Sequence, residues 1–130
     1  MFRLVKVMNG DNKFEATRIK YADNVNIEPG CALICTNGVL SAPASTSTPA
    51  YVSLSSNHDR RKRQIDAMIV TEDMVFKVEF TGSMTPQIGM IVGLSMINNK
   101  MDAVTYNTNG KGTIIGIEAE NNMVYVIFNK

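Results

Sequence analysis

Few residues in this chain of 130 could perform chemistry. The one histidine, His58, leaves no multi-histidine metal site, and the polar residues around it predict a solvated side chain. The twelve Asp and Glu residues are scattered, and no two of them have a spacing that predicts a shared cleft. We therefore expect a protein that is not an enzyme and that needs no cofactor and no metal.

The two cysteines, Cys31 and Cys35, are four positions apart. On a strand this spacing corresponds to roughly 13 Å, whereas a disulfide requires Cα atoms within about 7 Å. The pair cannot form a bridge there, and the Pro-Gly and Asn-Gly dipeptides that flank it leave too few residues for a helix. We expect two free thiols in a reducing compartment, both buried as small apolar residues.

The one run of charge in the chain is NHDRRKR, residues 57–63, in which Arg60, Arg61, Lys62 and Arg63 are consecutive. These four side chains could lie on a solvated loop, contact an acidic patch of a protein partner, or contact phosphates. A barrel that binds single strands would add exposed aromatic side chains, but the chain has 4 Tyr, 5 Phe and no Trp, most of them on apolar faces. The net charge of +1 points to no polyanionic partner. Nucleic acid is therefore the least favoured of the three.

The elements that would position these residues are short strands. Apolar stretches alternate with turn-forming dipeptides such as Pro29-Gly30 and Asn37-Gly38, and no segment offers ten or more residues at helical spacing. The predicted strands cover residues 2–8, 17–21, 31–36, 39–40, 50–56, 64–70, 74–80, 89–97, 103–106, 113–118 and 123–128. This pattern predicts an all-β fold, a single small antiparallel β-barrel or sandwich of about ten short strands, with one domain over residues 1–130.

Three of these strands carry information about their place in the fold. Residues 74–80 give the cleanest alternation in the chain, with Met74, Phe76, Val78 and Phe80 on one face and Lys77 and Glu79 on the other, which predicts a half-buried strand. Residues 123–128 are apolar on both faces, so we expect this strand in the middle of the assembly. Residues 2–8 mix Arg3 and Lys6 into the apolar pattern, which favours an edge position.

No apolar run near the N-terminus is long enough for a signal peptide. The longest apolar stretch, residues 89–97, is about half of what a membrane helix requires. We therefore expect a protein that is made in the cytoplasm and does not associate with a membrane.

The pattern of turns and strands resembles the small all-β decoration (cement) proteins of tailed-phage and prophage capsids. The residues that carry the resemblance are Pro29-Gly30, Leu33, Asn37-Gly38, Leu40, Pro49-Ala50-Tyr51-Val52-Ser53, Thr71, Asp73, Met74, Phe76 and the hairpin over residues 118–128. The resemblance implies a non-enzymatic protein that binds the outer surface of a phage capsid and stabilises the shell. It also implies the major capsid protein as partner, with other copies of this chain as a further one. Its place would be the capsid surface of the virion, after synthesis in the bacterial host cytoplasm.

The resemblance carries over no functional residue, so the candidate contacts rest on physical grounds. A charged loop and an unpaired sheet edge are what a partner could engage. The candidates are Arg60, Arg61, Lys62 and Arg63 in the basic run, with Phe2, Arg3 and Lys6 at the N-terminus. Two alternatives remain: a small nucleic-acid-binding barrel of the oligonucleotide-binding or SH3-like type that uses the Arg60–Arg63 loop, and an enzyme whose site is assembled from distant carboxylates.

Overall fold

The computed structural model describes residues 1–8, 15–97 and 100–129. Within them the chain forms eleven strands and one short 3-10 helix, in the order β1 (Arg3–Val7), β2 (Ala16–Tyr21), β3 (Ala32–Thr36), β4 (Val39–Ser41), β5 (Tyr51–Ser53), β6 (Gln64–Ile69), β7 (Met74–Thr81), β8 (Ile91–Ile97), β9 (Lys100–Tyr106), β10 (Gly112–Glu118), η1 (Ala119–Asn121) and β11 (Met123–Phe128). The sequence predicts a turn at residues 9–12 and another at residues 98–100; the first, and residues 98–99 of the second, lie outside the described residues. The predicted all-β fold of short strands is confirmed.

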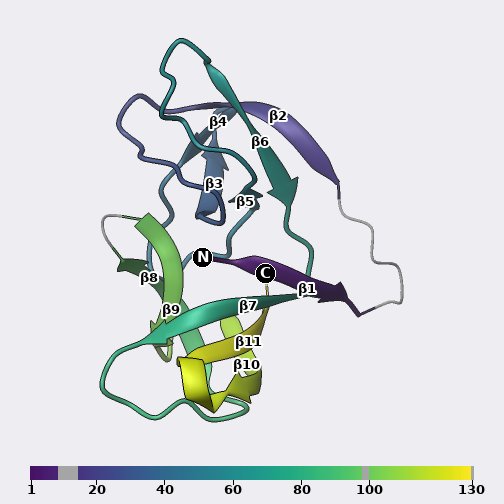
Figure 1. The fold of residues 1–130 in the computed structure, drawn as a ribbon, viewed down its shortest axis with the longest axis vertical. Helices are drawn as coiled ribbons and strands as arrows, with labels where there is room; N and C mark the ends of the chain where they lie inside the picture. The colour runs from purple at the N-terminus through teal and green to yellow at the C-terminus, as the bar shows by residue number, and fades with distance from the viewer. Residues whose placement is uncertain (9–14, 98–99, 130) are drawn as a thin grey trace.

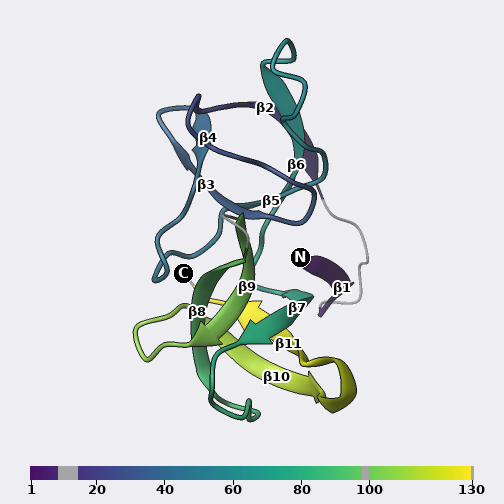
Figure 2. The same ribbon diagram turned by 60° about the vertical axis from the view of Figure 1, so that its left-hand side comes forward.

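The strands are distributed over two closed sheets, where the sequence suggested one barrel. The first barrel has the order β2-β4-β3-β5-β6 and closes through the antiparallel pairing of β2 with β6. The second contains β7, β11, β10, β8 and β9 and closes through a parallel pairing of β7 with β9, while β1 extends it by pairing with β7. The two barrels lie one above the other along the longest axis (Figures 1 and 2).

One buried cluster joins the barrels. Most of its side chains come from the second barrel, but Ala32, Val52 and Met68 belong to strands of the first. Strand β6 contributes side chains to two clusters, because its successive side chains point to opposite faces of the sheet. Ile65 and Ala67 are buried in the smaller cluster inside the first barrel, and Met68 is buried in the shared one.

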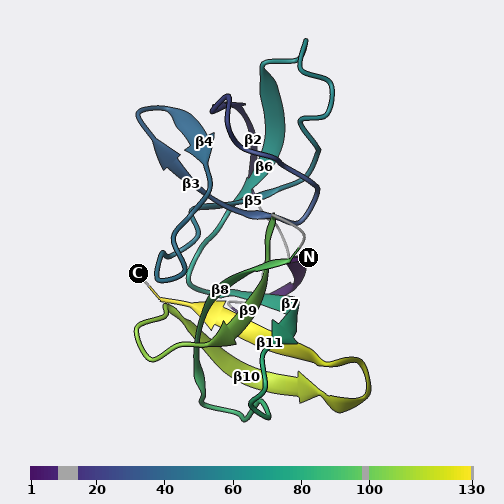
Figure 3. The same cartoon turned by 90° about the vertical axis from the view of Figure 1, so that its left-hand side faces the viewer.

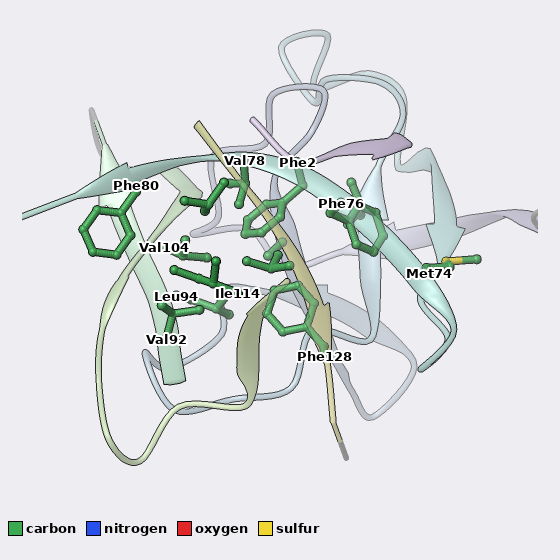
Figure 4. Close-up of a cluster of buried hydrophobic side chains, with 14 of the residues drawn as sticks. Phe2, Met74, Phe76, Val78, Phe80, Val92, Leu94, Val104, Ile114 and Phe128 are labelled. Carbon is green, nitrogen blue, oxygen red and sulfur yellow. The ribbon is translucent and has the colours of Figure 1, made fainter. Parts of the chain in front are cut away.

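Strand β7 contributes four side chains to the shared cluster and has the buried face that its alternation predicts. Its alternate residues Met74, Phe76, Val78 and Phe80 are all at most 2% exposed. Phe76 contacts two further aromatic rings, with centroid separations of 6.2 Å to Phe2 and 6.3 Å to Phe128 (Figure 4). Strand β11 lies between β7 and β10, which confirms its expected central position, and β1 lies at the end of the sheet order, which confirms its edge position.

The dipeptide Asn37-Gly38 makes the predicted tight hairpin between β3 and β4. Both residues have positive φ, 52° and 81°, and Thr36 pairs with Val39 directly across the turn. Gly30 also has positive φ at the predicted Pro-Gly turn. The Asn37-Gly38 dipeptide therefore fixes the register of β3 against β4 from local sequence.

An ion pair on the outside of the second barrel links β7 to β10 and gives a pH-dependent prediction. Lys77 Nζ lies 2.6 Å from Glu118 Oε2. The pKa of Glu118 lies below its usual range. The main cause is the hydrogen bond from Lys77, and the second is the hydrogen bond from Asn121. Because the folded pKa is the lower one, the contribution to stability is complete above the ordinary glutamate pKa and is lost as the pH falls through the folded value.

We therefore expect Lys77→Met to raise the pKa of Glu118 toward its ordinary value. Titration of the Glu118 side-chain carboxyl carbon by NMR measures the change directly. The exposed Lys111, changed to Met, is the matched control and should leave the Glu118 titration where it was. An unchanged pKa of Glu118 in Lys77→Met would contradict the assigned cause.

Candidate functional site

The basic run forms a loop at the end of the first barrel that lies away from the second (Figures 1 and 3). Its first residue, Asn57, is buried at 2% exposure. The Asn57 side chain accepts a hydrogen bond from the N–H of Ile27 at 3.0 Å and donates one to the carbonyl of Val25 at 2.8 Å. The Asn57 N–H donates to the Ile27 carbonyl at 3.2 Å. Three bonds thus fasten the start of the loop to the segment between β2 and β3.

Two of the four candidate cations of the loop are engaged within the protein. The Arg60 guanidinium lies over the ring of Tyr21, 5.5 Å from its centroid, and donates to the Val25 carbonyl at 3.2 Å. Arg61 donates from Nε and Nη2 to the carboxylate of Asp59 at 3.0 Å and 3.2 Å. Asp59 has a lowered pKa, chiefly because of this side-chain bond. Arg60 and Arg61 thus help to shape the loop.

The other two cations, Lys62 and Arg63, are exposed beside strand β2. Tyr21 donates from its hydroxyl to the carbonyl of Lys62 at 2.6 Å, which holds the end of the loop against this strand. Lys62 and Arg63 line a surface hollow of about 400 Å³ together with Arg18 and Lys20. Gln64 and Asp66 of β6 complete the lining.

Sequence reasoning missed the contribution of Arg18 and Lys20. They are two positions apart on β2, so both side chains project from the same face. The pairing of β2 with β6 sets Lys20 opposite Gln64 and Arg18 opposite Asp66, and Arg18 Nε lies 3.3 Å from Asp66 Oδ1. The alternating Arg-x-Lys pattern was a local signal, but only the pairing of two strands far apart in sequence brings it to the loop.

The N-terminal candidates divide into buried and exposed residues. Phe2 was wrong as a contact residue, because it is 2% exposed and packs in the aromatic cluster with Phe76 and Phe128. Arg3 and Lys6 are exposed on β1, at the end of the sheet order. They remain candidate contacts.

The His58 side chain is exposed, as predicted, and it also contacts Glu28. Its Nε2 lies 2.6 Å from Oε1 of Glu28, and Lys100 Nζ lies 3.5 Å from the same oxygen. Lys100 begins β9 of the second barrel, whereas Glu28 and His58 flank strands of the first. The group therefore forms a polar link between the barrels.

Exposed isoleucines gather on the second barrel. Ile91 on β8 and Ile115 and Ile117 on β10 are each 38% exposed, and Ile88 before β8 is 70% exposed. Strands β8 and β10 are paired neighbours. In the ribbon views β10 lies at the end of the molecule opposite the basic loop (Figures 1 and 3).

The two cysteines differ in burial, whereas the sequence predicted that both would be buried. Both thiols are free, but only Cys31 is buried, whereas Cys35 is exposed because it lies beside the Asn37-Gly38 hairpin tip, beyond the core. Burial raises the pKa of the Cys31 thiol, and the thiolate is the reactive form. We expect one fast and one slow thiol when the native protein reacts with an aromatic disulfide reagent.

In that experiment, Cys35→Ser should abolish the fast phase, and Cys31→Ser should leave it intact. Unfolding the wild-type protein in denaturant should expose the second thiol. Two fast thiols in the native protein would contradict the burial of Cys31.

Within the described residues, no group of three or more His, Cys, Asp or Glu side chains could hold a metal ion. No helix in that part of the chain is long and apolar enough to cross a membrane. No family model, curated protein or solved structure matches the chain.

Proposed function

We propose that this protein is a non-enzymatic decoration protein, which binds the outer surface of a phage capsid and stabilises the shell. The observation that carries the proposal is the presence of two exposed surfaces of different chemistry, one on each barrel. One is the basic hollow on the first barrel, and the other is the group of exposed isoleucines on β8 and β10 of the second. A protein with two separate contact surfaces can join two neighbouring subunits of a shell.

The resemblance of the turns and strands to decoration proteins supports the same proposal. Its hairpin at Asn37-Gly38 and its buried strand at residues 74–80 are both present in the fold. Closed barrels also suit a protein displayed on a surface, because closure removes most of the sheet edges that promote aggregation.

The mechanism is stabilisation by binding to the assembled state. A ligand that binds the intact shell and not its dissociated subunits shifts the equilibrium toward the shell. Each contact can be modest, because many copies act on one particle and each copy joins subunits that would otherwise separate. The partner is the major capsid protein, with other copies of this chain as a second possible neighbour, on a virion assembled in the bacterial cytoplasm.

The test is gradient sedimentation of a lysate from the cells that make this protein, after induction of a resident phage. We expect the protein to move with intact particles, in many copies per particle, and to remain bound in moderate salt. Its recovery at the top of the gradient as a free small protein would overturn the proposal.

A further inference from the structure

The basic hollow on the first barrel has the features of a binding site for negatively charged groups. Its lining holds four cationic side chains, Arg18, Lys20, Lys62 and Arg63, against one carboxylate, Asp66, which lies 3.3 Å from Arg18 Nε and leaves three of the cations without a carboxylate partner in the lining. All five are exposed, so the hollow is open to a ligand from solvent. The cations come from strand β2 and from the adjacent loop.

The surrounding structure holds this arrangement in place. Strands β2 and β6 pair over five residue positions, from Ala16 with Met68 to Lys20 with Gln64. The loop is fastened at its start by buried Asn57 and at its end by the bond from Tyr21 to the Lys62 carbonyl. A ligand would therefore meet cations on a scaffold that is already ordered, which lowers the entropy lost on binding.

The details of the lining favour carboxylates of a protein over nucleic acid. The six lining residues include no aromatic side chain on which a base could stack. Tyr21, the aromatic that the loop contacts, is 9% exposed and lies under the Arg60 guanidinium. The cations surround one hollow, whereas a nucleic-acid strand needs positive charge along the path of its backbone. The Gln64 side-chain amide can also donate to and accept from a peptide backbone.

We propose that this hollow binds a short acidic segment of a partner protein, with its carboxylates paired to Arg18, Lys20, Lys62 and Arg63. Arg and Lys bind carboxylates through charge-assisted hydrogen bonds, and Arg can do so through two parallel bonds. That the segment belongs to a capsid subunit rests on the proposed function, whereas the choice of acidic peptide over nucleic acid rests on the hollow alone.

The proposal separates the four cations of the loop into two classes. Lys62 and Arg63 contact the ligand, whereas Arg61 is paired with Asp59 outside the lining. Reversing charges in the hollow should therefore weaken binding much more than an equal change of charge elsewhere.

The experiment measures the binding of a fluorescently labelled polyglutamate peptide to the full chain by anisotropy, with a labelled oligothymidylate as the second probe. The test variant carries Lys20→Glu and Arg63→Glu. The matched control carries Lys6→Glu and Lys111→Glu, which change the net charge equally at exposed residues outside the lining and outside the loop. Circular dichroism and thermal melting establish that all variants fold, and the neutral pair Lys20→Gln and Arg63→Gln provides a second, milder test.

We expect the peptide to bind the wild-type protein and the control with similar affinity. Its affinity for the test variant should be lower by roughly tenfold or more. Added salt should weaken the binding, because the contacts are exposed. Three results would overturn the proposal: no binding of the peptide, equal loss in the control, or tighter binding of oligothymidylate through the same residues. The last would assign the hollow to nucleic acid.

The same variants in the particle gradient keep the two proposals distinguishable. If the peptide binds the hollow but the wild-type protein does not move with particles, the hollow proposal stands and the capsid proposal fails. If the test variant still moves with particles, the capsid proposal stands and the hollow is not its contact.

Discussion

Phe76→Ala should lower the free energy of unfolding by about 3–5 kcal/mol, the range observed when a buried aromatic is truncated to alanine. Phe76 is fully buried and contacts Phe2 and Phe128, which come from the two ends of the described chain. Its removal leaves a cavity that these rings can fill only by leaving their own packing positions. Chemical denaturation followed by circular dichroism measures the effect.

The matched control for this substitution is Ile115→Ala on the same barrel. Ile115 is 38% exposed, so we expect its loss to change stability much less than that of Phe76. The wild-type protein should also unfold in a single transition, because the cluster around Phe76 contains Val52 and Met68 of the other barrel. Equal effects of the two substitutions would contradict the place given to Phe76 in the core.

Asn57→Ala should cost about 2–3 kcal/mol, because it leaves the buried N–H of Ile27 without its partner. The Val25 carbonyl keeps a bond from Arg60, which limits the loss at that end. The substitution also releases the start of the basic loop, so binding of polyglutamate should weaken as well. Denaturation and anisotropy on the same preparation measure both effects.

Asn26→Ala is the control for this second prediction. Asn26 lies in the segment that Asn57 contacts, but its side chain is exposed. We expect its removal to leave both stability and peptide binding close to wild type. A loss of stability in Asn26→Ala as large as in Asn57→Ala would show that the bonds of Asn57 are not what holds the loop.

Local signals in the sequence predicted the elements of this fold well. The Asn37-Gly38 dipeptide fixed a hairpin because both residues accept positive φ, and the alternation over residues 74–80 identified a strand with one buried face. Both features depend on neighbouring residues alone, so a single sequence is enough to find them.

The arrangement of the strands depends on contacts between distant residues and was harder to predict. The division into two barrels includes parallel pairings, β2 with β4 and β7 with β9, and such pairings leave no turn signal between the strands. Phe2 shows the same difficulty on a smaller scale, because a single aromatic near a chain end does not reveal which rings it will meet.

The candidate site was only partly predicted, because its residues also come together through pairing of strands far apart in the sequence. The run Arg60–Arg63 marked the right loop, but its composition did not show that Arg60 would stack on Tyr21. Nor did it show that Arg18 and Lys20 would complete the hollow, since the bond between Arg18 and Asp66 spans 48 positions of sequence. Charge is visible in a sequence, whereas its distribution over a surface depends on strand pairing.

The proposed stabilisation of a capsid by this protein can be measured as a change in the temperature at which particles release their DNA. Particles from cells that lack the protein are heated with and without purified wild-type protein, and release is followed with a DNA-binding dye. We expect the added protein to raise the release temperature in proportion to its occupancy of the shell, because binding favours the intact state. The same release temperature with and without bound protein would contradict the claim.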